Sequence, residues 1–297
     1  MSVVVPTRDR LSLLRRAVES VRSQTFDDLE IIVTDDGSSD GTIEWALDQA
    51  APLRLVRTTA PPGSGPGPTR NRALEEARGE LIAFLDDDDT WTPDKLAVQV
   101  HWLDANPGHG FVFSDGWRLT APTTLEPLLR ARDLPVASVF DALLEGCFVH
   151  PSTLLVRHSL IDEVGGFDPA PHATEDYDFF LRLAMASPGG VLPNRLSIVR
   201  RLGDQRSRRH STELHVRAAA VVKPYSRDER LSLAQRRRAK LTASRLLSTA
   251  GQLDLEAGDR REARRHFIRS LRLRPFQRFA LRGLVESMLL RRESARL

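Results

Sequence analysis

The sequence has few of the features that mark secreted or membrane-spanning proteins. Its single cysteine, Cys147, can form no intramolecular disulfide, which is compatible with a reducing compartment. No apolar run approaches the ~20 residues that a membrane-spanning helix needs. The first residues, Met1-Ser2-Val3, lead directly into a predicted strand and leave no room for a secretory signal peptide. We therefore expect a cytoplasmic protein, and its 297 residues suffice for one large domain or two smaller ones.

Charge is distributed unevenly along the chain. Residues 1–199 carry 17 Lys and Arg against 30 Asp and Glu, a balance of −13, whereas residues 200–297 carry 26 against 10, a balance of +16. From about Leu214 onward strand formers are scarce and the pattern is helical. An acidic body joined to a basic tail predicts two segments with different partners. We expect a domain over residues 1–210 and a basic helical appendage over residues 211–297.

The first part of the chain alternates between predicted strands and helices. Apolar runs rich in β-branched residues predict strands, and apolar residues at helical spacing or capping residues predict helices. The expected strands are 2–6, 29–34, 53–56, 81–85 and 111–113, and the expected helices are 9–22, 40–50, 69–77 and 92–104. This alternation predicts an α/β fold with a largely parallel sheet and helices on both faces.

The pattern beyond residue 115 is less regular. Prolines break up residues 117–147, and this stretch has the length of a flexible loop over a site. After it we expect a strand over 148–156 interrupted at His150-Pro151, a helix capped by Thr174 and a strand near 196–201. In the tail, Ala257-Gly258-Asp259 and the helix after it resemble one tetratricopeptide-type hairpin, and a stable array of such units needs about three.

Four consecutive carboxylates, Asp86 to Asp89, follow the apolar run Leu81-Ile82-Ala83-Phe84-Leu85. An apolar run of this kind predicts a buried strand, and open α/β sheets bind their ligands at the carboxyl ends of their strands. Four adjacent acids repel one another, and a hard divalent cation with oxygen ligands would relieve that repulsion. The alternative is a solvated acidic turn.

Polar residues also follow two other predicted strands, Thr7 after the first and Asp35-Asp36 after the second. The carboxyl ends of these strands should meet at one edge of the sheet. A nucleotide could then bind with its base and ribose on Thr7 and Asp36 and its diphosphate on a metal held by Asp86 and Asp88. An Asx-type turn with a helix cap at Asp40 is the structural alternative for the Asp35–Asp40 stretch.

Four motifs in order resemble family 2 glycosyltransferases over roughly residues 1–205. They are Val3-Val4-Val5-Pro6-Thr7, Asp35-Asp36-Gly37-Ser38-Ser39-Asp40-Gly41-Thr42, Phe84-Leu85-Asp86-Asp87-Asp88-Asp89, and Gly165-Gly166-Phe167-Asp168 followed by Glu175-Asp176-Tyr177-Asp178. The resemblance implies a GT-A fold, with a nucleotide-sugar-binding half over 1–115 and an acceptor half over 116–210. It also implies inverting transfer of a sugar from a nucleoside-diphosphate donor to a glycan or lipid-linked acceptor.

The resemblance also implies roles for residues on the donor side. Asp36 would hydrogen-bond the base, with Thr7 beside it, and Arg70 would lie near the donor. Asp86 and Asp88 match the outer acids of the family's D-x-D motif: Asp86 would face the ribose or sugar, and Asp88 would bind Mn²⁺ or Mg²⁺. Because this chain has four acids where three are usual, Asp87 or Asp89 is the substitute if the register shifts by one residue.

On the acceptor side, Asp176 matches the family's catalytic base, with Glu175 in support. Such a base takes the proton of the attacking hydroxyl, which contributes about 10²–10⁴-fold to the rate. The alternative for both acids is stabilisation of a first helical turn by the helix dipole. His150 could line the acceptor side or be a structural residue at a strand kink. Leu202 stands where a similar family segment often has a histidine, which speaks against a metal or phosphate contact there.

The basic tail allows several interpretations. Arg206–His210 and Arg236-Arg237-Arg238 could meet anionic lipid at the inner face of a membrane. Nucleic-acid binding is disfavoured because no aromatic interleaving accompanies the arginines, and a solvated helix face is the plainest alternative. Two rival functions also remain: a nucleotidyltransferase, and a nucleotide-sugar-binding module without turnover.

Overall fold

The computed structural model describes residues 1–58, 61–129, 138–169, 174–200 and 208–289, the last range without the side chains of 208–211 and 289. The chain folds into two compact units. Unit 1 comprises Met1–Leu143, Phe148–Pro171 and Asp178–Gly203, and unit 2 comprises Leu144–Cys147, His172–Tyr177 and Asp204–Leu297.

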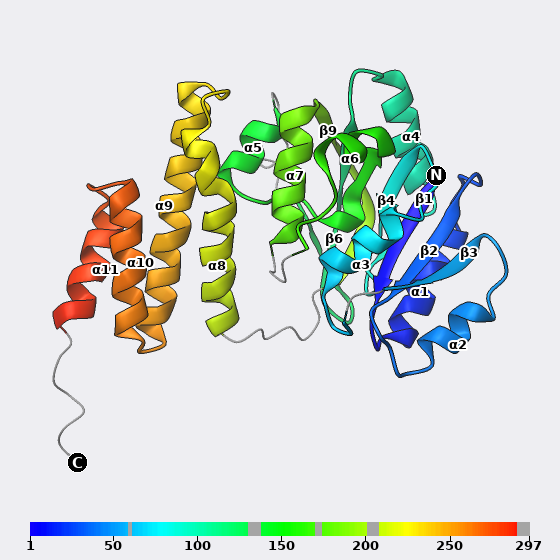
Figure 1. Ribbon diagram of the computed structural model, residues 1–297, viewed down its shortest axis with the longest axis horizontal. Coiled ribbons are helices and arrows are strands. Elements are labelled where there is room, and N and C mark those ends of the chain that lie inside the picture. The colour runs from blue at the N-terminus through cyan, green and yellow to red at the C-terminus, as the bar shows by residue number, and fades with distance from the viewer. Residues whose placement is uncertain (59–60, 130–137, 170–173, 201–207, 290–297) are drawn as a thin grey trace, which may run out of the picture. The chain divides into compact units, whose positions relative to one another are not determined.

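Unit 1 is built on a nine-stranded sheet in the order β3-β2-β1-β4-β8-β6-β9-β5, with β7 paired to β6 (Figure 1). The strands are β1 (Ser2–Thr7), β2 (Glu30–Asp35), β3 (Leu53–Arg57), β4 (Leu81–Phe84), β5 (Thr90–Trp91), β6 (Phe111–Ala121), β7 (Thr124–Pro127), β8 (Leu154–Arg157) and β9 (Gly189–Arg200). The α/β fold predicted from the sequence is confirmed. The parallel part is β3-β2-β1-β4 together with the β6–β9 pair, whereas β8 runs antiparallel between β4 and β6, so the whole sheet is mixed.

Helices cover both faces of this sheet, as predicted. Successive side chains of a strand point to opposite faces. On one face, Val3, Val5 and Ala83 join one buried cluster with side chains of α1 (Leu11–Arg22), α2 (Thr42–Leu47) and α4 (Lys95–Ala105). On the other, Phe84 packs edge-on against Phe167 and against Phe179 of α7 (Glu175–Ala186), with ring centroids 5.3 and 6.0 Å apart.

Several helix boundaries differ from those expected. Helix α3 (Pro66–Leu74) begins three residues before Thr69, because Gly65 adopts a φ of +94° and Pro66 supplies the preset φ of a first helical residue. Helix α2 is shorter than predicted and follows Gly41 at φ +87°. Asp40, expected to cap α2, accepts hydrogen bonds from the N–H of Leu11 at the start of α1 as well as from Thr42.

The expectation of a flexible loop over residues 117–147 is wrong for the described part of that stretch. Strand β6 continues to Ala121, β7 forms a hairpin with it, and α5 (Val139–Glu145) follows. Strand β6 pairs with β9 along most of its length, and the two approach closely: a Cβ on Gly189 would lie 2.1 Å from the Phe111 ring. Proline spacing alone does not reveal this long-range pairing.

A lysine is completely buried in unit 1. The ammonium group of Lys95 donates to Gln99 Oε1 at 2.5 Å and lies 4.2 Å from the ring centroid of Trp91. Gln99 in turn donates to the carbonyls of Val112 and Thr153. Burial lowers the pKa of Lys95 to about 7, because a low-polarity environment disfavours the charged form.

Unit 2 is largely helical. It contains α8 (Arg208–Val222), a 3₁₀ segment (Lys223–Arg227), α9 (Leu233–Glu256), α10 (Arg260–Leu273) and α11 (Arg278–Leu289). Helix α9 packs against α8 and α10, and α10 packs against α11. The predicted turn at residues 257–259 joins α9 to α10, with Gly258 at φ +84°. Within the described ranges, no helix combines the length and apolar character needed to cross a membrane.

Candidate active site

The carboxyl ends of β1, β2 and β4 lie side by side, and the side chains that follow them meet as the sequence predicted. Thr7 Oγ1 donates a hydrogen bond to Asp87 Oδ2 at 2.8 Å. The N–H of Asp36 donates to the carbonyl of Thr7 at 3.0 Å. One edge of the parallel part of the sheet therefore carries Thr7, Asp36 and the acidic run Asp86–Asp89.

The four carboxylates of the acidic run alternate in exposure. The side chains of Asp87 and Asp89 are 7% and 1% exposed, whereas those of Asp86 and Asp88 are 23% and 31% exposed. Asp89 accepts hydrogen bonds from Ser152 Oγ at 2.5 Å and from the N–H of Arg200 at 2.8 Å. Asp87 and Asp89 thus face inward, while Asp86 and Asp88 reach the surface.

Burial shifts the pKa values of the two inner acids upward. It raises the pKa of Asp87 to about 6, while the Thr7 hydrogen bond and the Arg10 charge lower that pKa and Asp88 and Asp86 raise it. Burial, followed by the charge of Asp86, raises the pKa of Asp89 well above its ordinary value. The raised pKa values favour the neutral forms of Asp87 and Asp89, which reduces the repulsion among the four acids.

Asp86 is held by a buried arginine. Arg70 Nη2 lies 2.5 Å from Asp86 Oδ1, and the Arg70 side chain is 4% exposed. Its guanidinium carbon lies 5.2 Å from the ring centroid of Phe167. Arg70 and Asp86, which the family resemblance places near the donor, therefore form a preorganised ion pair at the site edge.

His150 lies beside the acidic run. Its Nε2 is 3.7 Å from Asp86 Oδ2 and its Nδ1 is 3.4 Å from Asp89 Oδ2. The 3₁₀ turn Pro151–Thr153 fixes this position, because His150 caps it by accepting the N–H of Ser152 on Nδ1. Donor atoms of Asp86, Asp89 and His150 all lie within 4.8 Å of one another, and two carboxylates with one imidazole are ligands that suit a divalent transition metal.

Asp36 is engaged by the loop before α3. Its Oδ1 accepts the N–H groups of Gly63 at 3.1 Å and Ser64 at 3.3 Å, and its Oδ2 accepts the N–H of Gly65 at 3.1 Å. Asp35 instead accepts the N–H groups of Gly37 and Ser38. The Asx-type turn proposed as an alternative therefore holds for Asp35, whereas Asp36 binds a different segment.

Asp176 and Glu175 occupy the first turn of α7. Asp176 Oδ1 accepts the N–H of Tyr177 at 2.7 Å, and the Asp176 side chain is half-buried, whereas Glu175 is buried. Both acids belong to unit 2 and the acidic run belongs to unit 1, so their joint action stays a prediction. Leu202 and the Arg206–His210 cluster lie outside the residues whose side chains are described.

Arg10 and Ser152 were not anticipated from the sequence. Arg10 Nη1 lies 3.2 Å from Asp87 Oδ1 and 3.3 Å from Asp88 Oδ2. A cavity of about 480 Å³ opens beside it, lined by Asp9, Arg10, Leu11, Ser12, Arg15 and Asp40. A positive charge directly after a strand that ends at the predicted site was the available signal for Arg10. For Ser152 no local signal exists, because its partners Asp86 and Asp89 are more than sixty positions away.

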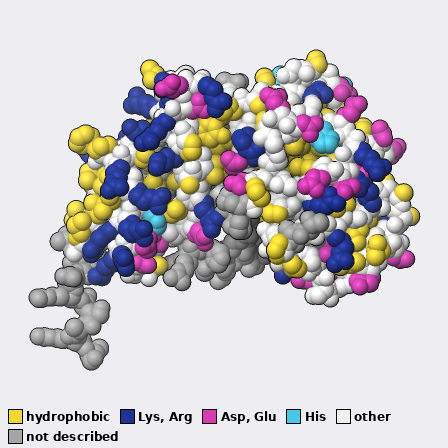
Figure 2. Space-filling view, in the orientation of Figure 1, with side chains coloured by type: hydrophobic (Ala, Val, Ile, Leu, Met, Phe, Trp, Pro, Cys, Tyr) yellow, Lys and Arg dark blue, Asp and Glu magenta, His cyan; other side chains and the backbone are white. Residues whose placement is uncertain are grey.

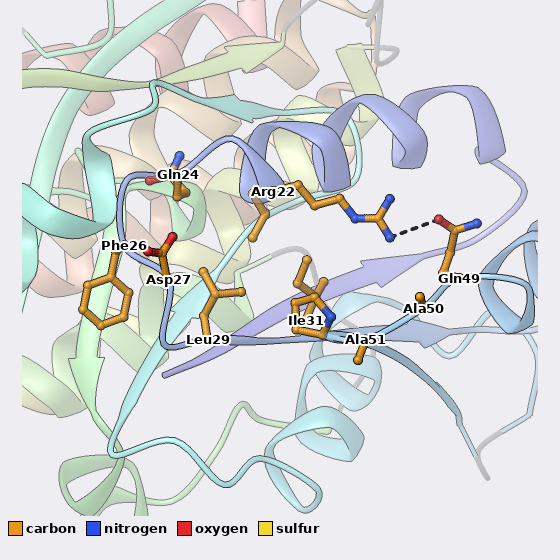
Figure 3. Close-up of a pocket in the computed structure, with 11 residues that line it drawn as sticks. Arg22, Gln24, Phe26, Asp27, Leu29, Ile31, Gln49, Ala50 and Ala51 are labelled. Carbon is orange, nitrogen blue, oxygen red and sulfur yellow. Dashed lines mark hydrogen bonds between the residues drawn. The ribbon is translucent and has the colours of Figure 1, made fainter.

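A second cavity lies at the opposite edge of the sheet. It has a volume of about 530 Å³ and is lined by residues around the C-terminus of α1 and the starts of β2 and β3, including Phe26, Leu29, Ile31 and Pro52. Arg22 Nη2 donates to Gln49 Oε1 at 3.1 Å across it (Figure 3). None of the sequence-predicted site residues lines this cavity, so it is separate from the acidic edge.

Comparison with known sequences identifies the family. The sequence model of glycosyl transferase family 2 matches residues 2–164. The chain belongs to glycosyltransferase family 2. The family that the four motifs predicted is confirmed.

Individual relatives match only part of the chain. A Campylobacter jejuni GalNAc(5)-diNAcBac-PP-undecaprenol beta-1,3-glucosyltransferase is 37% identical over 117 residues, which cover 39% of this chain and 37% of that protein. Another relative, an uncharacterized glycosyltransferase of Rickettsia felis, is matched over 32% of its length. The chain thus spans about a third of each of these two relatives.

Solved structures share the fold. The S. aureus TarS 1–349 complex with UDP-GlcNAc superposes with a TM-score of 0.66 at 18% identity, covering 96% of this chain and 88% of that one. The mannosyltransferase PcManGT from Pyrobaculum calidifontis, in complex with GDP-Man and Mn²⁺, gives a TM-score of 0.61 at 19% identity, covering 97% and 85%. The predicted GT-A fold is confirmed.

Proposed function

We propose that this family 2 glycosyltransferase is inverting and metal-dependent and that its acceptor is a glycan or a lipid-linked glycan. The observation that carries the proposal is the alternation of exposure along Asp86–Asp89. Asp87 and Asp89 are buried, whereas Asp86 and Asp88 reach the surface and have the spacing of a D-x-D motif. This pattern favours the Asp86/Asp88 register, and Asp89 stays an alternative ligand because one of its oxygens lies within 4.8 Å of donor atoms of Asp86 and His150.

A divalent cation, Mn²⁺ or Mg²⁺, would be held by Asp88 and Asp86. His150 is a further ligand within reach, with its Nε2 3.7 Å from Asp86 Oδ2. When bound, such a cation stabilises the negative charge that develops on a departing nucleoside diphosphate. The Mn²⁺ complex of the PcManGT structure supports this assignment by analogy of fold.

Donor binding is assigned to residues 1–115. Asp36 and Thr7 would contact the base, and the Arg70–Asp86 pair would contact the ribose or sugar. Arg10 is added to this set, because a guanidinium beside Asp87 and Asp88 also suits a diphosphate. The TarS complex with UDP-GlcNAc supports a UDP-sugar as the first donor to test.

Acceptor binding and proton transfer are assigned to residues 116–210, with Asp176 as the general base and Glu175 in support. The base takes the proton of the acceptor hydroxyl as its oxygen attacks the anomeric carbon, and the bond to the diphosphate breaks on the opposite face. The dipole of α7 favours the ionised form of an acid in its first turn, which keeps Asp176 ready to accept that proton. The undecaprenol-linked substrate in the name of the Campylobacter relative supports a lipid-linked acceptor at the cytoplasmic face of a membrane.

Site variants test the proposal. Asp88→Ala is expected to abolish transfer and metal-dependent donor binding, and Asp176→Asn to abolish transfer while leaving donor binding intact. Asp162→Asn, at an exposed position on α6 (His158–Val164), is the matched control. Near wild-type turnover by Asp176→Asn would refute the base assignment. Release of pyrophosphate instead of a nucleoside diphosphate would identify a nucleotidyltransferase.

The donor can be found before the acceptor is known. Ligand binding raises the thermal stability of the native state by mass action. A thermal-shift screen of nucleotide sugars with and without Mn²⁺ should single out one donor whose effect needs the metal. Equal shifts in the presence of a chelator would contradict the metal dependence.

A further inference from the structure

Exposed large hydrophobic side chains are concentrated in unit 2. Among the described residues, Leu47 and Leu125 are the two in unit 1, and nine others lie in unit 2. Five of the nine belong to α11 or to the turn before it: Phe276, Phe279, Leu281, Val285 and Met288, which are 90%, 52%, 41%, 50% and 51% exposed. Together with Arg274, Arg278 and Arg282, these five side chains are termed the α11 surface.

The other side of α11 is already packed. Ala280 is buried in a cluster with Ala263 and Phe267 of α10, and a Cβ on Gly283 would lie 2.2 Å from the Phe267 ring. Leu281, Val285 and Met288 recur at spacings of four and three residues, which places them on one side of the helix. A helix that is apolar on more than its packed side is characteristic of a segment that is covered by something else.

Positive charge predominates in the part of the chain that carries these apolar side chains. Residues 260–289 contain nine arginines and two glutamates. Each glutamate is already paired within its own helix, Glu262 with Arg265 at 2.6 Å and Glu286 with Arg282 at 2.7 Å. Figure 2 shows Lys and Arg side chains spread over the helices of unit 2 and hydrophobic side chains along the rim that α11 occupies. The partner of this surface must therefore accept both apolar groups and strong positive charge.

We infer that the α11 surface binds the interfacial region of an anionic lipid bilayer. Phenylalanine and aliphatic side chains at a helix surface enter the boundary between headgroups and acyl chains, while arginines contact anionic headgroups. The α11 surface provides both kinds of contact. This inference is independent of the assigned sugar transfer, because it concerns only where the chain docks.

A second copy of the chain fits this surface less well. A symmetric contact would bring the arginines of one copy against the same arginines of the other. Unit 1 is acidic and could complement the positive charge of the α11 surface, but it has few apolar groups to offer. Its exposed large hydrophobic side chains among the described residues are Leu47 on α2 and Leu125 on β7. A bilayer with anionic headgroups meets both requirements.

Vesicle co-sedimentation of the full chain tests the inference without any sugar substrate. The probes are phosphatidylcholine vesicles with and without phosphatidylglycerol, at low and high salt. The wild type is expected to sediment with the anionic vesicles, and binding should weaken as salt rises. Phe276→Ser/Phe279→Ser should weaken binding roughly tenfold or more, and Arg278→Gln/Arg282→Gln roughly fivefold per arginine.

Matched controls lie on unit 1. Leu47→Ser/Leu125→Ser removes the two exposed large hydrophobic side chains among the described residues of that unit, and Arg16→Gln/Arg78→Gln removes two exposed arginines. All substituted side chains are exposed, so the variants should keep the wild-type circular dichroism spectrum. The inference is overturned if the wild type does not bind anionic vesicles, or if the controls lose as much binding as the α11 variants. It is also overturned if sedimentation velocity reveals an oligomer that Phe276→Ser/Phe279→Ser dissociates, because the surface then serves contact between copies.

Discussion

Replacing the buried Lys95 by methionine should change how the stability of the protein depends on pH. Burial lowers the pKa of this lysine to about 7 from its ordinary value of 10.5. Between these two values the unfolded chain binds one more proton than the native state, so the free energy of unfolding rises with pH, by at most about 1.4 kcal/mol per pH unit. The free energy of unfolding of the wild type should therefore increase by about 2 kcal/mol between pH 7 and pH 9 because of this one lysine.

Lys95→Met removes this dependence and keeps most of the side-chain volume. Near pH 7 the charge penalty of the lysine is about 4 kcal/mol, and leaving Gln99 Oε1 without its donor costs about 1–3 kcal/mol. The variant should therefore be more stable than the wild type at pH 7 by roughly 1–3 kcal/mol. This advantage should shrink as pH rises and fall to about zero near pH 9, where the charge penalty of the lysine has decreased to about 2 kcal/mol.

Urea unfolding followed by tryptophan fluorescence measures this effect in the right part of the molecule. All four tryptophans, Trp45, Trp91, Trp102 and Trp117, lie in unit 1. Other groups that titrate between pH 7 and 9 are shared by wild type and variant and cancel in the difference. Lys240→Met on the exposed face of α9 is the control and should run parallel to the wild type. Parallel curves for Lys95→Met would refute a neutralised, buried lysine.

Three further predictions concern the acidic edge. Arg10→Gln removes the cation between Asp87 and Asp88, so Mn²⁺ should bind more tightly and a nucleoside diphosphate more weakly, each by up to about fivefold. Calorimetric titration measures both affinities, with Arg16→Gln as the control. No change in either affinity would contradict the placement of Arg10. Ser152→Ala removes a donor to the buried Asp89 and should cost about 1–3 kcal/mol in urea unfolding, whereas Ser114→Ala, at a buried hydroxyl with no partner among the described residues, should be nearly neutral. Gly63→Ala strains a φ of +82° and crowds Arg8, so the amides of residues 63–65 should exchange hydrogen faster than in Gly108→Ala.

The predictable part of the fold rests on local patterns. β1, β2 and β4 could be recognised because each is a short apolar run followed by polar residues, and their parallel order follows from the intervening helices. The pairing of β6 with β9 could not be recognised from the sequence, because it joins residues about eighty positions apart and depends on how closely Gly189 approaches Phe111. Sequence periodicity does not encode contacts of that range.

The candidate site divides in the same way. The convergence of Thr7 with the acidic run follows from strand ends alone. Strand ends do not predict which of the four acids face inward. That depends on partners elsewhere in the chain, namely Arg10 and Thr7 for Asp87 and Ser152 for Asp89. The position of His150 beside Asp86 likewise depends on a 3₁₀ turn that the sequence pattern did not reveal.

The hydrogen bonds from residues 63–65 to Asp36 affect how nucleotide preference can evolve or be redesigned. Three backbone N–H groups already occupy the carboxylate that is assigned to the base. A base that hydrogen-bonds Asp36 must first displace these N–H groups. Its binding free energy is then weakened by the free energy needed to release the loop. Substitutions in the loop can then change the affinity for all nucleotides together, while Asp36 itself stays untouched. Discrimination between bases would have to come from contacts that differ from one base to another.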